Sequence, residues 1–201
     1  MATHATSWSA DEIPTPTGLR GFYYSRFSAP LWLAVRLGVG ATWLYAGIEK
    51  LVDANGAWMG AYAGAAVRGF VADALAKNMG PRPEVSGWYA AFLRDVVLPH
   101  ATFFSVLVTV GEIAVGLGLI AGLFTGVAAF FGGFMNLCFM LAGTAGINPV
   151  LFVLATWLVL AWRVAGHWGL DRWVLPRLGA PGWPGPRAWR RRELLAAFRN
   201  G

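Results

Sequence analysis

The stretch 106–148 is almost entirely apolar and is interrupted only by a short turn at 122–126. It is long enough for two helical crossings of a lipid bilayer, since one crossing takes about 20 residues. One acidic residue, Glu112, and one strongly polar amide, Asn136, lie within it. At about 1.5 Å per residue, Glu112 lies about 17 Å from a helix start near Ala101, close to the middle of a bilayer. A carboxyl group there is costly without a partner, so Glu112 is the first candidate for a functional residue.

The composition indicates an all-α polytopic membrane protein. Hydrophobic residues make up 57% of the chain and charged residues only 13%, about half the charged fraction of a soluble domain. The single cysteine, Cys138, excludes an internal disulfide and a multi-cysteine metal site. We expect no metal or haem site, because His100 and His167 fall on opposite sides of the predicted membrane, and no nucleic-acid partner.

The apolar runs predict a four-helix bundle in the lipid bilayer, with crossings at about 29–51, 101–121, 125–145 and 150–168. Residues 1–28 are expected to be a flexible tail, 29–175 the membrane domain, and 176–201 a basic tail. The outer loop 52–99 is expected to contain short interfacial helices at 57–79 and 88–98. Arginines near both ends favour a plasma-membrane protein with both termini in the cytoplasm. The segment 187–198 is interpreted as a membrane anchor or as a docking helix for a cytoplasmic partner.

The polar residues within the crossings allow a functional and a structural interpretation. Glu112 could exchange protons or bind a polar ligand, or it could be a protonated acid bonded to a neighbouring helix at Asn136. Asn136 could itself contact a ligand or join two helices. Arg36 could extend toward the cytoplasmic headgroups, or pair with a buried group or an anionic substrate. Cys138 is interpreted as a small apolar core residue.

A second polar group is expected where the first two crossings reach the outer surface. Glu49 and Lys50 end the first crossing there, and His100 precedes the second. A cationic Lys50 and a titratable His100 could attract a small oxyanion or take protons from a quinol. The alternative is an ordinary membrane boundary.

Three segments carry a resemblance to a known family: RLGVGATWLYAGIEKLVD at 36–53, VGEIAVGLGLIAGLFTGVAAFFGGFMNL at 110–137 and LAGTAGINP at 141–149. Together they resemble the DoxX/DoxD membrane proteins, over about 31 to 178. The resemblance implies a four-helix membrane bundle. In the DoxD branch it implies a subunit of thiosulfate:quinone oxidoreductase, which with a DoxA partner oxidises thiosulfate to tetrathionate and passes electrons to quinone. The positions that match the polar pattern of the family are Glu49, Lys50, Glu112, Asn136 and Asn148.

Three hypotheses for the function follow. In the first, the chain is a quinone-linked oxidoreductase subunit with a DoxA-like partner; quinone enters near Trp43, Tyr45 and Phe134, and Glu112 moves its proton. In the second, the chain is a non-catalytic scaffold that recruits redox or respiratory partners through its basic tail. In the third, it is a small proton-coupled exporter. The chain could also associate with copies of itself.

Overall fold

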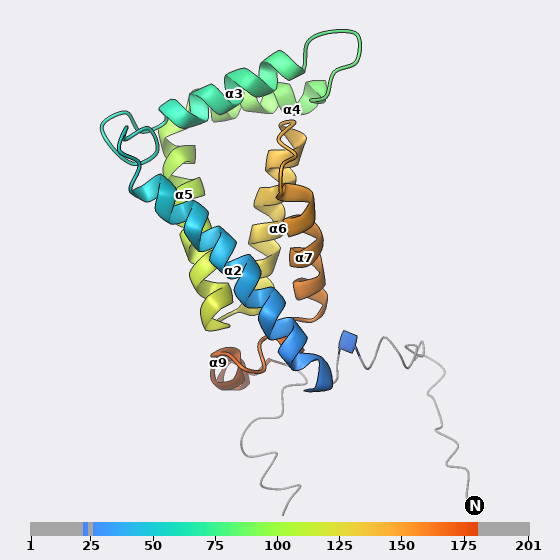
Figure 1. Cartoon of the computed structure of the whole chain (residues 1–201). Helices are drawn as coiled ribbons and strands as arrows, with labels where there is room; N and C mark the ends of the chain where they lie inside the picture. The colour runs from blue at the N-terminus through green and yellow to red at the C-terminus, as the bar shows by residue number, and fades with distance from the viewer. Residues whose placement is uncertain (1–21, 24–25, 181–201) are drawn as a thin grey trace, which may run out of the picture.

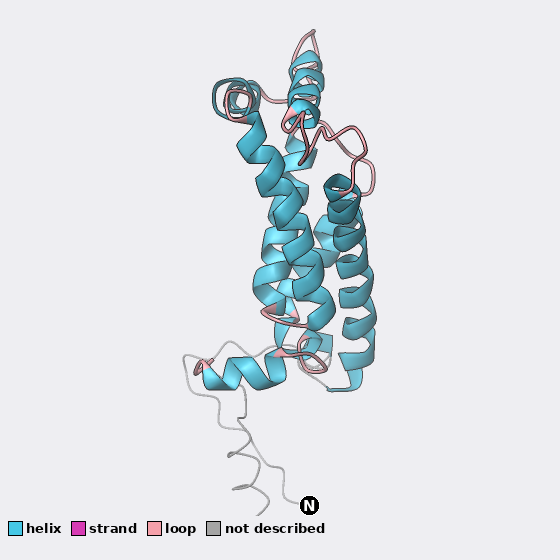
Figure 2. Ribbon diagram, turned by 90° about the vertical axis from the view of Figure 1, so that its left-hand side faces the viewer, coloured by secondary structure: helices cyan, strands magenta, loops and turns pink. Residues whose placement is uncertain are grey.

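The computed structural model describes residues 22–23 and 26–180, and all regular elements in this part are helical (Figures 1 and 2). The predicted helix at 187–198 and most of the predicted tail at 1–28 lie outside the described residues. The helical elements of this part are, in chain order, η1 (Arg26–Ser28), α2 (Ala29–Leu51), α3 (Ala65–Lys77), α4 (Gly87–Phe92), η2 (Leu93–Val97), α5 (Ala101–Ala121), α6 (Thr125–Leu141), α7 (Asn148–Leu160), α8 (Trp162–Ala165) and α9 (Asp171–Arg177).

Helices α2 and α5 are long and apolar enough to cross a membrane, with 23 and 21 residues. Both have the bounds expected from the sequence. Pro30 lies in the first turn of α2, where its missing N–H leaves no hydrogen bond unmade. The apolar helices α6 and α7 are shorter, with 17 and 13 residues.

The boundaries of α6 and α7 differ from those expected at 125–145 and 150–168. Helix α6 ends at Leu141, and the chain then turns through Gly143, whose φ of +74° suits glycine. Helix α7 ends at Leu160 because Ala161 has a non-helical ψ of 11°, and the short α8 follows. The last apolar segment is therefore two helices rather than one.

Glycines allow α2 and α5 to pack with their backbones close together. A β-carbon at Gly116 of α5 would lie 2.5 Å from the backbone nitrogen of Leu44. A β-carbon at Gly47 of α2 would lie 2.9 Å from the backbone nitrogen of Ile113. Such distances leave no room for a side chain, so these glycines determine how closely the two helices approach.

Helices α3 and α4 with η2 lie across one end of the bundle, at the top of Figure 1, and we call them the cap. The cap has a hydrophobic cluster of its own. The Tyr89 hydroxyl donates a hydrogen bond to the Cys138 carbonyl of α6, at 2.8 Å, and Lys77 Nζ donates one to the Gly143 carbonyl, at 3.0 Å. Burial raises the pKa of Tyr89, so its hydroxyl remains a donor at neutral pH. These bonds attach the cap to the α6–α7 turn.

The cap helices are shorter than the sequence suggested. The helix expected at 57–79 begins only at Ala65, because Gly56 and Gly64 adopt positive φ values of 64° and 91° in the preceding turns. The helix expected at 88–98 is α4 followed by the π-helical turn η2.

Two glycine substitutions test the α2–α5 contact. Gly116→Ala is expected to lower the free energy of unfolding by about 1–3 kcal/mol, because its β-carbon would overlap the α2 backbone. Gly38→Ala on α2 is the control, since its β-carbon would have no neighbour within 4 Å and alanine favours a helix. The measurement is denaturation of the purified protein in mild detergent. Equal losses in both variants would show that the close approach is not what matters.

Candidate functional site

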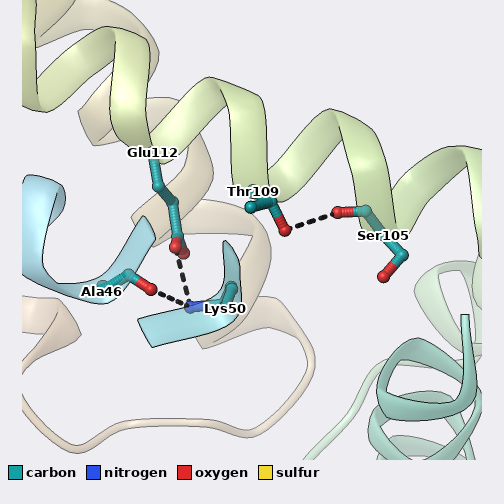
Figure 3. A network of polar contacts seen from close by, with 5 residues as sticks. All are labelled: Ala46, Lys50, Ser105, Thr109 and Glu112. Atoms are coloured by element: carbon teal, nitrogen blue, oxygen red, sulfur yellow. Dashed lines mark hydrogen bonds and ion pairs between the residues drawn. The ribbon is translucent and has the colours of Figure 1, made fainter. Parts of the chain in front are cut away.

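A buried ion pair joins α2 to α5 in the interior of the bundle. Lys50 Nζ lies 2.7 Å from Glu112 Oε2, and the Glu112 side chain is 2% exposed. The distance is that of an ion pair, and the Lys50 side chain, at the edge of the bundle, is 19% exposed. Figure 3 shows the two side chains pointing toward each other from neighbouring helices. Glu112, expected to be either a free proton carrier or a partner of Asn136, is instead paired with a lysine.

The loop between α2 and α3 covers the lysine. Lys50 Nζ lies 4.9 Å from the centre of the Trp58 ring and donates a weak hydrogen bond of 3.4 Å to the Ala46 carbonyl. The Ser105 hydroxyl holds this loop through a 2.7 Å hydrogen bond to the Trp58 carbonyl. Thr109, one turn further along the same face of α5, donates to the Ser105 carbonyl (Figure 3). The cation is thus enclosed by an aromatic ring, a carbonyl and its acid.

Asn136 of α6 lies at the level of Glu112. A β-carbon at Gly111, which precedes Glu112, would lie 3.4 Å from the sulfur of Met135, which precedes Asn136. Asn136 is 0% exposed, yet neither its Oδ1 nor its Nδ2 has a hydrogen-bond partner. The predicted hydrogen bond between Glu112 and Asn136 is therefore absent: the acid turns toward α2, where Lys50 offers a full charge.

Trp43 of α2 adds another buried donor without a partner. Its side chain is 3% exposed, and its indole Nε1 makes no hydrogen bond. A β-carbon at Gly132 of α6 would lie 2.9 Å from this nitrogen and 3.1 Å from Val115 of α5. Trp43, Lys50, Glu112 and Asn136 thus occupy adjacent turns of three helices, and we call this group the polar layer.

Three other candidates lie away from the polar layer. His100 is exposed at the cap end of α5, and its Nδ1 is 2.9 Å from the Val96 carbonyl. Glu49 is exposed, although its neighbour Lys50 is not. Asn148 begins α7, and its amide donates to the Thr144 carbonyl. The expected grouping of Lys50 with His100 is therefore not formed, since Lys50 turns inward to Glu112.

The three aromatic candidates are also separated. Trp43 is buried in the bundle, whereas Tyr45 and Phe134 are 65% and 52% exposed on the outside of their helices. Successive helix positions differ by about 100°, so Trp43 and Tyr45 cannot share a face. Only Trp43 adjoins the other polar residues.

Arg36 forms a second polar group at the end of the bundle opposite the cap. Its side chain does not extend to solvent: it is 2% exposed and makes one weak bond, 3.4 Å, to the Trp168 carbonyl. Its guanidinium packs on Gly122 and Gly169, where any β-carbon would overlap it. The opposite charge that acts on it is Asp171, at a distance beyond that of an ion pair. The expectation of an arginine extended to the headgroups is wrong.

Sequence reasoning missed Asp171 and Trp58. Asp171 is fully buried, and its carboxylate accepts hydrogen bonds from the backbone N–H groups of Phe124 and Thr125, at 2.6 and 2.9 Å. It therefore caps the start of α6 from a distant part of the chain. A lone acid at the start of a tail rich in arginine was the available signal. The sequence carries no signal for Trp58, since its contact with Lys50 depends on how the loop folds.

A double-mutant cycle measures the buried ion pair. Lys50→Met alone is expected to lower the free energy of unfolding by about 3 kcal/mol, because Glu112 loses its cation in an apolar interior. Adding Glu112→Met should restore most of that loss, since the two groups are then both apolar. Asp95→Asn in the exposed Arg94–Asp95 pair is the control and should change little. Additive losses in the double variant would mean that the pair is not coupled.

Comparison with known proteins assigns the family. A family model described as DoxX matches residues 31–145, which is more than half of the chain and includes the whole polar layer. No curated protein and no solved structure matches the chain. Among the described residues, no group of three or more histidine, cysteine, aspartate or glutamate side chains could hold a metal ion. The family match confirms the resemblance seen in the sequence: the chain belongs to the DoxX family of membrane proteins.

Proposed function

We propose that this DoxX protein is the membrane subunit of a quinone-linked oxidoreductase, with thiosulfate as the electron donor. The observation that carries the proposal is the Lys50–Glu112 ion pair, 2.7 Å long and buried between α2 and α5. Ionisable groups inside a membrane domain are expensive and commonly mark proton or ligand pathways. The thiosulfate part of the proposal comes from the resemblance to the DoxD branch, in which the membrane subunit and a DoxA partner together oxidise thiosulfate.

The proposed topology has four crossings with both termini in the cytoplasm. Helix α6 is about 25 Å long, and α7 with α8 extends about 27 Å, close to the hydrocarbon thickness of a bilayer. Arg172 and Arg177 of α9 lie at the end opposite the cap, and further arginines follow in the sequence. Cationic residues favour the cytoplasmic side, so the cap is placed outside.

Accessibility of single cysteines tests this topology. With Cys138 replaced by alanine, a cysteine at Glu84 in the cap should react with a membrane-impermeant maleimide added to intact cells. A cysteine at Arg177 should react only after the membrane is opened. The reverse pattern, or labelling of both sites in intact cells, would exclude four crossings with an outer cap.

The residues of the ion pair fit a quinone because both can carry protons at its level of the bundle. Bound quinone takes up two electrons and two protons to become quinol, while two thiosulfate ions lose the two electrons and join as tetrathionate. In the ion pair the proton is on Lys50, so the Lys50 ammonium would donate a proton to a ring oxygen, and Glu112 would hold the ammonium and pass on the proton that recharges it. Two such donations would supply the two protons. Trp58 and the helices shield the pair partly, since the Lys50 side chain is 19% exposed and the Glu112 side chain only 2%, and this burial strengthens their mutual attraction. Protons would return from the side of the cap.

Binding of a short-tailed quinone tests the proposal. Decylubiquinone should stabilise the purified protein in mild detergent, by about 2.7 kcal/mol at a hundredfold excess over Kd. Glu112→Gln should reduce the rise in melting temperature, because the amide cannot replace the charged partner of Lys50. Glu84→Gln, an exposed acid in the cap loop, is the control.

Two outcomes would contradict the proposal. An equal rise in wild type and Glu112→Gln would remove Glu112 from the site. The absence of any rise in wild type would favour the scaffold hypothesis, and the next measurement would be the identification of partners that purify with the chain.

A further inference from the structure

We infer that the amide of Asn136 and the indole N–H of Trp43 together bind the polar head of a lipid-soluble ligand, beside the Lys50–Glu112 pair. The inference rests on the proposed function and adds a ligand-binding site to it. Its starting point is a set of three hydrogen-bonding atoms that are buried and unpartnered in one small region: Asn136 Oδ1, Asn136 Nδ2 and Trp43 Nε1.

Such atoms are unusual in a folded protein. Buried polar side chains almost always have a hydrogen-bond partner, and one left without a partner destabilises the fold. Asn136 and Trp43 are 0% and 3% exposed, so bulk water does not satisfy them. Neither side chain holds its helices together by hydrogen bonding. Their retention in an otherwise apolar interior is explained if a ligand supplies the missing bonds.

The two side chains converge on one place. The Cα–Cβ bond of a helical residue points toward the N-terminus of its helix, so the Asn136 side chain lies over the preceding turn of α6, where Gly132 is. Gly132 has no side chain, and the position of its missing β-carbon is 2.9 Å from Trp43 Nε1. The amide and the indole nitrogen therefore both lie at Gly132, where the indole and Val115 pack directly against the α6 backbone.

The register of the helices places this pair next to the acid. Contact of Gly111 with Met135 puts Glu112 and Asn136 at one level, and a β-carbon at Gly47 would lie 3.2 Å from the Glu112 β-carbon. On α2, Gly47 lies between the other two residues: Trp43 is about one turn before it and Lys50 almost one turn after it. The head of a ligand held by Asn136 and Trp43 would thus lie about one helical turn from the Glu112 carboxylate, because α5 runs antiparallel to α6 and the Glu112 side chain points the other way, toward Lys50.

The chemistry of the three atoms defines the ligand. Trp43 offers one donor, and Asn136 offers two donors and an acceptor. They suit a head with ring oxygens that accept hydrogen bonds when oxidised and donate one when reduced, as a quinone and its quinol do. The thioether of Met135, half-buried across Gly111, closes the α5–α6 contact at this level. Methionine is flexible, so this contact is where a ligand would enter from lipid.

Two substitutions that remove the polar atoms but keep the bulk of the side chain test the inference. The probe is decylubiquinone, and its Kd is measured by titration calorimetry with the purified protein in mild detergent. Asn136→Leu and Trp43→Phe should each raise the Kd about tenfold or more. The matched controls are Thr156→Val and Trp157→Phe on exposed positions of α7, which should leave the Kd unchanged.

Stability without the probe distinguishes a ligand site from a structural role. Asn136→Leu should melt at the same or a higher temperature than wild type, because it removes two unpartnered polar atoms from the interior. A lower melting temperature with an unchanged Kd would make Asn136 a structural residue and overturn the inference. If the melting temperature and the quinone affinity of Asn136→Leu both fall, the Trp43→Phe variant distinguishes the two roles. An unchanged Kd in Trp43→Phe would then overturn the inference as well.

The outcomes separate this inference from the proposed function. If decylubiquinone binds wild type and both variants with one Kd, the inference fails and quinone binding stands. If decylubiquinone does not bind wild type at all, the proposed function fails, and the site loses its proposed ligand with it.

Discussion

The fold depends on bringing two opposite charges together in an apolar interior. A lysine and a glutamate are each costly to bury, and the cost is offset only when the two meet at close range. In this protein the meeting requires that α2 and α5 approach until their backbones nearly touch, which Gly47 and Gly116 allow. The glycines and the ion pair therefore depend on each other. The close approach places the charges, and the charges fix how far each helix can rotate or slide against the other.

The remaining polar groups lie at the two ends of the bundle and in the polar layer between them. Hydrogen bonds from Tyr89 and Lys77 attach the cap to the α6–α7 turn, and Asp171 caps α6 at the opposite end. These groups have partners and serve the architecture. Asn136 and Trp43, in the layer between, are buried without them. Arg36 and Thr125, at the end opposite the cap, also have buried polar atoms without a partner, so it is the place of Asn136 and Trp43 in the polar layer that makes them available to its ligand.

The sequence predicted the parts of the fold that depend on local composition. The bounds of α2 and α5 followed from the length of their apolar runs, and Glu112 stood out as an acid in such a run. Its partner could not be predicted, because helix rotation is set by packing and Lys50 at a helix end resembles an ordinary boundary charge. For the same reason the sequence left two alternatives for Arg36, extension to the headgroups or a buried partner, and the structure buries it near Asp171. Asp171 depends on a contact between residues 46 and 47 positions apart in the chain, which no local pattern reveals.

The distribution of charge along the chain has a consequence for biosynthesis. Helix α2 is translated before α5 and α9 and carries both Arg36 and Lys50, and the acids that act on them come later, at positions 112 and 171. While the chain is still being translated, the newly inserted α2 holds two uncompensated cations. Its two ends can therefore become buried only one after the other. The end with Lys50 is buried once α5 has been made, and the end with Arg36 once α9 has been made. Truncated chains that stop before position 171 would therefore leave a buried guanidinium without its acid, a defect that quality-control proteases in the membrane could recognise.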